Sequence, residues 1–66
     1  MPDRECEEAC LEAYQEAVKN CYRVLFDSLA AARTEEERRE CKERFNRCME
    51  LSKEARKTCL DACHGQ

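Results

Sequence analysis

The sequence predicts an all-α fold, an antiparallel hairpin of two helices with cysteines paired across the seam between them. Three observations predict this fold: the composition, the positions of the cysteines and a turn signal near the middle of the chain. Of the 66 residues, 41% are charged, Gly and Pro occur once each and Trp is absent. This composition favours helices and argues against a sheet. We expect one domain over residues 1–66, whose core is too small to be stable without cross-links or a bound metal.

The first helix is expected over about residues 3–32. Asp3 is a suitable N-cap, because its carboxylate accepts hydrogen bonds from the free amides of the first turn, and Pro2 lies just outside the helix. Glu5 and the glutamates that follow it complement the positive end of the helix dipole. No Gly or Pro ends this helix, so its end is set by the turn that follows.

The turn is expected at about residues 33–34, followed by a second helix over about 35–64. Thr34 and Glu37 have the spacing of a capping box, in which each side chain accepts a hydrogen bond from the backbone near the other. The centre of the cysteine arrangement described next lies directly after Thr34, so two independent signals select the same turn. Gly65 is expected to end the second helix.

The seven cysteines are arranged symmetrically about this turn. The residue numbers of three pairs each sum to 69: Cys6 with Cys63, Cys10 with Cys59, and Cys21 with Cys48. A constant sum is expected of an antiparallel hairpin, because residues at equal distances from the turn lie at the same level on the two arms. By the same rule the seventh cysteine, Cys41, lies opposite Ser28, a polar isostere of cysteine. The sequence therefore predicts three cross-helix pairs and one free thiol.

The inward-facing residues of both helices recur in alternating steps of four and three, the pattern of an antiparallel coiled coil. In the first helix these seam positions are Cys10, Tyr14, Ala17, Cys21, Val24, Ser28 and Ala31. In the second helix they are Cys41, Phe45, Cys48, Ser52, Ala55, Cys59 and Ala62. The cysteines therefore line the seam and are not scattered over the surface.

An apolar stripe runs beside the seam of the first helix. It consists of Leu11, Val18, Tyr22, Leu25, Phe26 and Leu29. The second helix offers few apolar residues to cover it, so two interpretations are open. Either arginine side chains lie over the stripe, with Arg47 on Tyr22, or the stripe is a binding surface, most simply for a second copy that completes a four-helix bundle.

The paired cysteines suit two chemistries. The motif CxxxC occurs twice, as Cys6 with Cys10 and as Cys59 with Cys63, so four sulfurs meet at the open end of the hairpin. They can form two parallel disulfides, or their thiolates can bind Cu(I) or Zn. The third pair of cysteines favours disulfides, because it would be an isolated site short of the usual four metal ligands. We therefore expect disulfides and no cofactor, with metal binding by the four end cysteines as the alternative.

This arrangement of CxxxC, hairpin and CxxxC resembles the plant α-hairpinins and, more loosely, the coiled-coil-helix proteins of the mitochondrial intermembrane space. The α-hairpinin resemblance covers the four end cysteines and implies pairing of outer with outer and inner with inner. It also implies antimicrobial activity or protease inhibition through a residue near the turn, which here is Arg33. The chain departs from that family in its longer arms and its extra Cys21, Cys41 and Cys48. The repeated CxxxC is also similar to the cysteine-rich copper-storage four-helix proteins, which carry many more cysteines.

Several function classes are disfavoured. The charges are mixed in sign with a net value of −3, so no basic stripe is available for nucleic acid. No apolar stretch is long enough to span a bilayer. His64 is the only histidine, and no nucleophile, base and orienting group form a catalytic set. We therefore predict a non-enzymatic protein.

The leading hypothesis is a disulfide-linked hairpin that acts as a binding or structural module through the apolar stripe, toward a protein partner or itself as a homodimer. The alternatives are a Cu(I) or Zn thiolate protein and an α-hairpinin-like inhibitor or antimicrobial peptide. The dense use of Glu, Arg, Lys and Ala also fits a designed scaffold. The sequence encodes no compartment, but disulfides imply an oxidising one, such as a secreted, periplasmic or intermembrane-space location.

Overall fold

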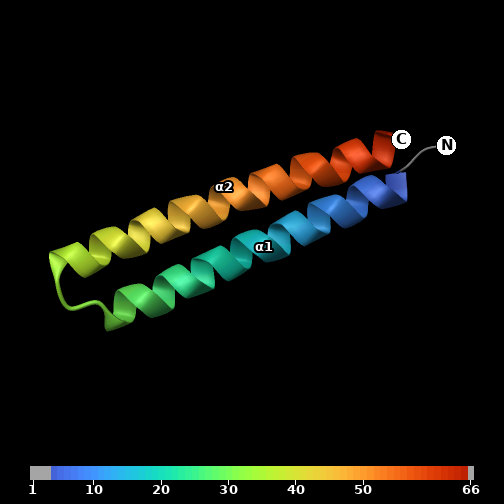
Figure 1. The fold of residues 1–66 in the computed structure, drawn as a ribbon. Helices are drawn as coiled ribbons and strands as arrows, with labels where there is room; N and C mark the ends of the chain where they lie inside the picture. Colours follow the sequence, from blue (N-terminus) through green and yellow to red (C-terminus); the bar gives the residue numbers. More distant parts are fainter. Residues whose placement is uncertain (1–3, 66) are drawn as a thin grey trace.

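The computed structural model describes residues 4–65, which form two antiparallel α-helices that lie side by side (Figure 1). Helix α1 spans Arg4–Ala31 and helix α2 spans Glu35–Gly65. The start of α1 and the end of α2 lie together at one end, and residues 32–34 form the turn at the other. The fold is therefore all-α and a hairpin, as predicted. No helix within residues 4–65 has the length and apolarity needed to cross a membrane.

The helix bounds agree with the predicted ones to within about a residue. The predicted cap at Asp3 and the neighbouring Pro2 lie outside the described residues. The second helix was predicted to end at residue 64, with Gly65 after it, whereas in the structure Gly65 is the last residue of α2. Nothing lies within 4 Å of the position that a β-carbon on Gly65 would occupy, so no close contact requires a glycine there.

The turn contains the predicted capping box. The Thr34 hydroxyl accepts a hydrogen bond from the Glu37 amide (3.1 Å), and the Glu37 carboxylate accepts one from the Arg33 amide (2.7 Å). The carboxylate thus reaches one residue further back than in the usual box, where it bonds the N-cap amide itself. The amide of Ala32 donates to the Leu29 carbonyl (3.2 Å), which closes the end of α1. Most polar groups of this short turn are thereby used locally.

Burial along both helices follows an eleven-residue repeat. The buried residues are Cys10 and Cys21 in α1 and Cys41 and Ser52 in α2, eleven positions apart in each case. Half-buried residues fill corresponding positions after them: Tyr14, Ala17, Val18, Leu25, Ser28 and Leu29 in α1, and Phe45, Cys48, Met49, Arg56, Cys59 and Leu60 in α2. An eleven-residue repeat over three turns has about 3.67 residues per turn, slightly more than a straight helix, so each helix keeps one face toward its partner without the left-handed supercoil of a heptad repeat.

This repeat corrects part of the predicted seam. Four predicted seam residues are exposed: Val24, Ala31, Ala55 and Ala62. The residues one position later are half-buried in their place: Leu25, Ala32, Arg56 and Cys63. The physical reason is that a strict heptad drifts by about 20° per repeat on a straight helix. The cysteine pairs fix the facing side every eleven residues, so the first inward position after Cys21 is Leu25, and Val24 is left 51% exposed.

Candidate functional site

Three disulfides join α1 to α2. They are Cys6–Cys63, Cys10–Cys59 and Cys21–Cys48, and their sequence separations are 57, 49 and 27. Each brings its two Cα atoms to 5.8 Å, within the range that a disulfide requires. These are the three pairs predicted from the constant sum of residue numbers. We call each level of the hairpin at which two residues have numbers that sum to 69 a rung, and we number the three disulfide-linked rungs first to third from the open end.

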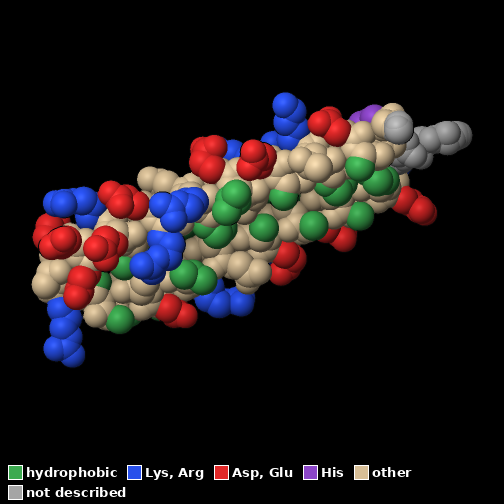
Figure 2. All heavy atoms as spheres, in the orientation of Figure 1, with side chains coloured by type: hydrophobic (Ala, Val, Ile, Leu, Met, Phe, Trp, Pro, Cys, Tyr) green, Lys and Arg blue, Asp and Glu red, His purple; other side chains and the backbone are tan. Residues whose placement is uncertain are grey.

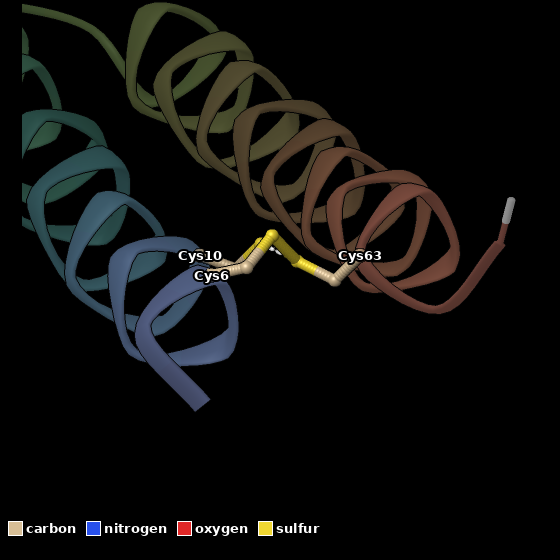
Figure 3. A group of neighbouring side chains, drawn as sticks. All are labelled: Cys6, Cys10 and Cys63. Carbon is tan, nitrogen blue, oxygen red and sulfur yellow. Dashed lines mark hydrogen bonds between the residues drawn. A yellow bond between two sulfur atoms is a disulfide. The ribbon is translucent and has the colours of Figure 1, made fainter. Parts of the chain in front are cut away.

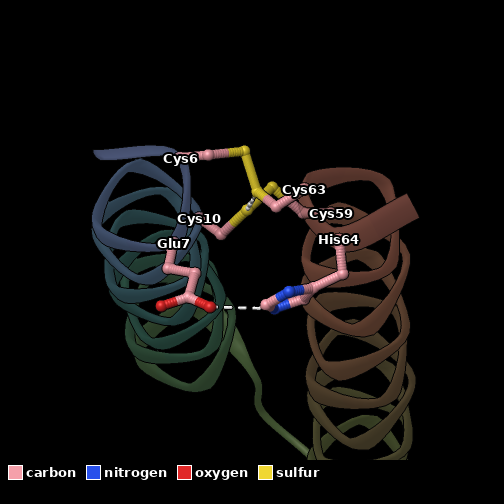
Figure 4. Close-up of a disulfide and its surroundings, with 6 residues drawn as sticks. All are labelled: Cys6, Glu7, Cys10, Cys59, Cys63 and His64. Carbon is pink, nitrogen blue, oxygen red and sulfur yellow. Dashed lines mark hydrogen bonds and ion pairs between the residues drawn. A yellow bond between two sulfur atoms is a disulfide. The ribbon is translucent and has the colours of Figure 1, made fainter. Parts of the chain in front are cut away.

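Two of these disulfides lie next to each other at the open end of the hairpin (Figure 4). The Sγ atoms of Cys10 and Cys63 belong to different disulfides, yet they are only 3.6 Å apart. Together with the Sγ atom of Cys6 they form a group whose members all lie within 4.8 Å of one another. Cys6 is exposed, Cys63 is half-buried and Cys10 is buried, so this group opens to solvent on one side. We call Cys6, Cys10, Cys59 and Cys63 the sulfur cluster.

A cross-helix ion pair lies beside the sulfur cluster. The His64 Nε2 atom is 2.8 Å from a carboxylate oxygen of Glu7 (Figure 4). Sequence reasoning missed this contact. A signal for it was present, because each of the two residues directly follows a cysteine of the first rung, Cys6 or Cys63. Neighbours of paired residues lie at nearly the same level on the two arms.

The third disulfide is buried on its α1 side, where Cys21 is only 1% exposed, while Cys48 is half-buried. The Ser52 hydroxyl donates a hydrogen bond to the carbonyl of Cys48 (2.9 Å) and lies 3.6 Å from the Sγ atom of Cys21. Ser52 is itself buried and faces Ala17 under the same sum of 69. A serine in this place satisfies its polar group locally, so it costs the core little.

Cys41 is the one cysteine of the described chain outside a disulfide, and it is buried. Its predicted counterpart Ser28 is half-buried and donates to the carbonyl of Val24 (2.7 Å) or Leu25 (3.1 Å). Five rungs therefore recur along the hairpin in alternating steps of four and seven residues: 6–63, 10–59, 17–52, 21–48 and 28–41. Disulfides occupy three of them, and the other two carry small or polar side chains.

The described residues do not make the predicted contact between Arg47 and Tyr22. The contact is instead between Arg56 and Tyr14, with 4.5 Å from the guanidinium carbon to the ring centroid. It lies between the second and third disulfides, where small side chains leave a narrow cavity. That cavity is lined by Cys10, Ala13, Tyr14, Ala17, Ser52, Ala55, Arg56 and Cys59. The guanidinium stacks on Tyr14 because the eleven-residue repeat brings position 56 toward α1.

The apolar stripe of α1 is largely uncovered. Leu11 is 48% exposed, Tyr22 61% and Phe26 60%; Val18, Leu25 and Leu29 are half-buried. The rings of Tyr22 and Phe26 stack with their centroids 6.4 Å apart. With Val18 they line a shallow hollow whose edge is formed by Lys19 and Arg23. We call Val18, Tyr22 and Phe26 the aromatic patch.

Apolar and charged side chains are segregated on the surface. Figure 2 shows hydrophobic side chains in a band along the molecule, with Lys, Arg, Asp and Glu on either side of it. Two further exposed apolar residues are Val24 and Leu51, at 51% and 58%. Arg33, the candidate for an inhibitor-like role, is exposed in the turn. Its backbone is held by the hydrogen bond to Glu37.

Comparison of the chain with protein-family profiles, with curated proteins and with solved structures gave no match. The resemblance to α-hairpinins and to coiled-coil-helix proteins therefore rests on the cysteine positions and on the hairpin itself. What the geometry establishes is a cysteine-rich helical hairpin joined by three disulfides.

Proposed function

We propose that the protein is a non-enzymatic, disulfide-linked helical hairpin that functions as a binding module, and that the aromatic patch binds a second copy of the chain to complete a four-helix bundle. The observation that carries the proposal is the exposure of two stacked aromatic rings, Tyr22 and Phe26, on a helix held rigid by the disulfides. Large apolar side chains grouped on a surface are typical of interfaces.

The size of the exposed surface supports association. The chain has an accessible surface of 5362 Å². A compact monomeric protein of 7.8 kDa exposes about 4,400 Å² by the usual scaling with mass. The excess of roughly 1,000 Å² is comparable to the ~800 Å² that one partner contributes to a standard interface. Two helices alone cannot surround a core, whereas four helices can.

The charges beside the aromatic patch are compatible with a second copy. Lys19 and Arg23 flank the patch, and two copies related by a two-fold axis would bring these cations near one another. Lys19 already forms an ion pair with Glu16 of its own helix at 3.8 Å. This pairing partly offsets the charge of Lys19, whereas Arg23 donates a hydrogen bond to the neutral side chain of Asn20 (3.4 Å) and keeps its charge.

Sedimentation equilibrium across a concentration series up to about 1 mM tests this proposal. At 1 mM, a Kd as weak as about 1 mM corresponds to only 4.1 kcal/mol, so even a weak dimer is detected. We expect the mass of a dimer for the wild-type chain and of a monomer for the double variant Tyr22→Glu/Phe26→Glu. Circular dichroism should show that the variant remains helical, since both side chains are mostly exposed.

Leu51→Glu is the matched control. Leu51 is 58% exposed, close to Tyr22 and Phe26, but it lies on α2 away from the aromatic patch. The control introduces one of the two negative charges of the double variant and removes one exposed apolar side chain, and it should remain dimeric. A wild-type chain that stays monomeric throughout the series, or a control that dissociates as fully as the double variant, contradicts the proposal.

A further inference from the structure

We propose that the sulfur cluster becomes a zinc site when its two disulfides are reduced, with Cys6, Cys10, Cys59 and Cys63 as the four thiolate ligands. This inference is independent of the proposed association through the aromatic patch. It concerns the opposite end of the hairpin from the turn, where four cysteines from two helices converge (Figure 4).

The spacing of the sulfurs matches a tetrahedral site. Zinc bound by four thiolates has Zn–S distances of about 2.3 Å, which places the sulfurs about 3.8 Å from one another. The Sγ atoms of Cys10 and Cys63, which are not bonded to each other, are already 3.6 Å apart. All three sulfurs of Cys6, Cys10 and Cys63 lie within 4.8 Å of one another (Figure 3). Breaking the two disulfides lets the bonded sulfurs separate toward the same spacing without moving the helices far.

The coordination number favours zinc over Cu(I). Three of the four sulfurs lie within 4.8 Å of one another, and the fourth, that of Cys59, is bonded to Cys10. A closed set of four thiolates in a tetrahedron is the usual structural zinc site. The exposed side of the cluster at Cys6 provides a path by which the ion enters. The third rung, Cys21–Cys48, is three turns away and supplies no ligand to this site.

Reduction of the two disulfides comes before zinc binding. Each disulfide takes two electrons and two protons from a dithiol reductant, which is itself oxidised to a disulfide, and leaves two cysteine thiols. Four thiols then bind one Zn²⁺ as thiolates and release their protons to solvent. The bound zinc then replaces the two disulfides as the cross-link between α1 and α2, because metal binding is coupled to folding.

The test is a zinc titration of the reduced full-length chain under anaerobic conditions. A phosphine serves as reductant, since it becomes a phosphine oxide with water as the source of oxygen and protons and leaves no dithiol to compete for metal. Native mass spectrometry gives the number of bound ions, and competition with a chromophoric chelator gives the affinity. We expect one zinc per reduced chain, none per oxidised chain, and a tetrahedral thiolate absorption spectrum with Co²⁺ as a probe.

Matched cysteine variants locate the site. Cys63→Ser removes a ligand and should weaken zinc binding by more than the roughly 10–100-fold that loss of an outer-shell partner costs. Cys41→Ser removes a cysteine outside the cluster, and Cys21→Ala/Cys48→Ala removes the third rung; both should still bind one zinc. No zinc on the reduced wild-type chain, equal binding by Cys63→Ser and wild type, or equal binding by the oxidised chain would each overturn the proposal.

Discussion

The guanidinium group of Arg56 lies over the ring of Tyr14, with 4.5 Å between the guanidinium carbon and the ring centroid. The pair joins the two helices between the second and third disulfides. Elsewhere in this interval the helices meet through small side chains, including Ala13, Ala17 and Ala55. The side chain of Arg56 thus adds contact between the two helices where the neighbouring side chains are small.

Replacing Arg56 by alanine should destabilise the hairpin by about 1 kcal/mol, because it removes the cation–π contact and the packing of the arginine stem. The free energy of unfolding in guanidinium chloride measures this loss. Arg47→Ala is the control: Arg47 is exposed, and its side chain makes no hydrogen bond, ion pair or cation–π contact within the described residues. Equal losses for the two variants would show that the contact with Tyr14 contributes nothing.

The three disulfides should contribute unequally. When Cys10–Cys59 is already formed, adding Cys21–Cys48 closes a loop of about 24 residues, whereas adding Cys6–Cys63 closes one of about 10. The larger loop removes more conformational entropy from the unfolded chain. Cys21→Ala/Cys48→Ala should therefore cost roughly 1 kcal/mol more than Cys6→Ala/Cys63→Ala. The greater burial of Cys21 acts in the same direction. Chemical unfolding of the two variants measures the difference, and the reverse order would contradict this account.

Ser28→Cys should create a fourth disulfide with Cys41. The two positions form a rung of the same class as the three existing ones, in the same eleven-residue repeat. The new bond closes the interval between the third rung and the turn and should stabilise the hairpin by up to about 3 kcal/mol. Intact mass and alkylation detect the bond, with Ser28→Ala as the control for loss of the hydroxyl. A variant that retains two alkylatable thiols would show that positions 28 and 41 do not face each other.

Thr34→Ala should lower the stability by about 1 kcal/mol, because the amide of Glu37 loses its acceptor. Thr58→Ala is a matched control at an exposed position within α2, where alanine is the better helix former. The control should leave the stability unchanged or raise it by a few tenths of a kcal/mol. Thermal unfolding followed by circular dichroism distinguishes the two results, and equal shifts for both variants would argue against a capping role.

The hairpin, its turn and the cysteine pairs could be predicted from the sequence because they depend on chain geometry alone. The sum of 69 defines the level of each cysteine, and Thr34 with Glu37 marks the turn independently. The inward face near Val24 and Leu25 was predicted wrongly for a physical reason. Inward-facing residues that repeat every 3.5 or every 3.67 residues differ by one position only after several turns. Val24 and Leu25 are both apolar, so the preference of apolar residues for burial does not show which of the two faces inward.

The contacts of long polar side chains could not be predicted to the same degree. Arg47 and Arg56 are both arginines near apolar surface, and only the rotation of α2 set by the disulfides decides which one meets a tyrosine. The Glu7–His64 pair likewise depends on the side to which each residue points after its cysteine. Self-association and zinc binding depend on a second molecule, which residue spacing within one chain does not specify.

The intact mass of the natively purified protein, taken before and after alkylation, shows whether the chain holds three disulfides and a single free thiol at Cys41. Because three bonds form, the mass should fall short of the fully reduced value by about six hydrogens. Under denaturing, non-reducing conditions one alkyl group should be added, and peptide mapping should place it on Cys41. Seven alkylated cysteines, or one alkylated cysteine other than Cys41, would contradict the account.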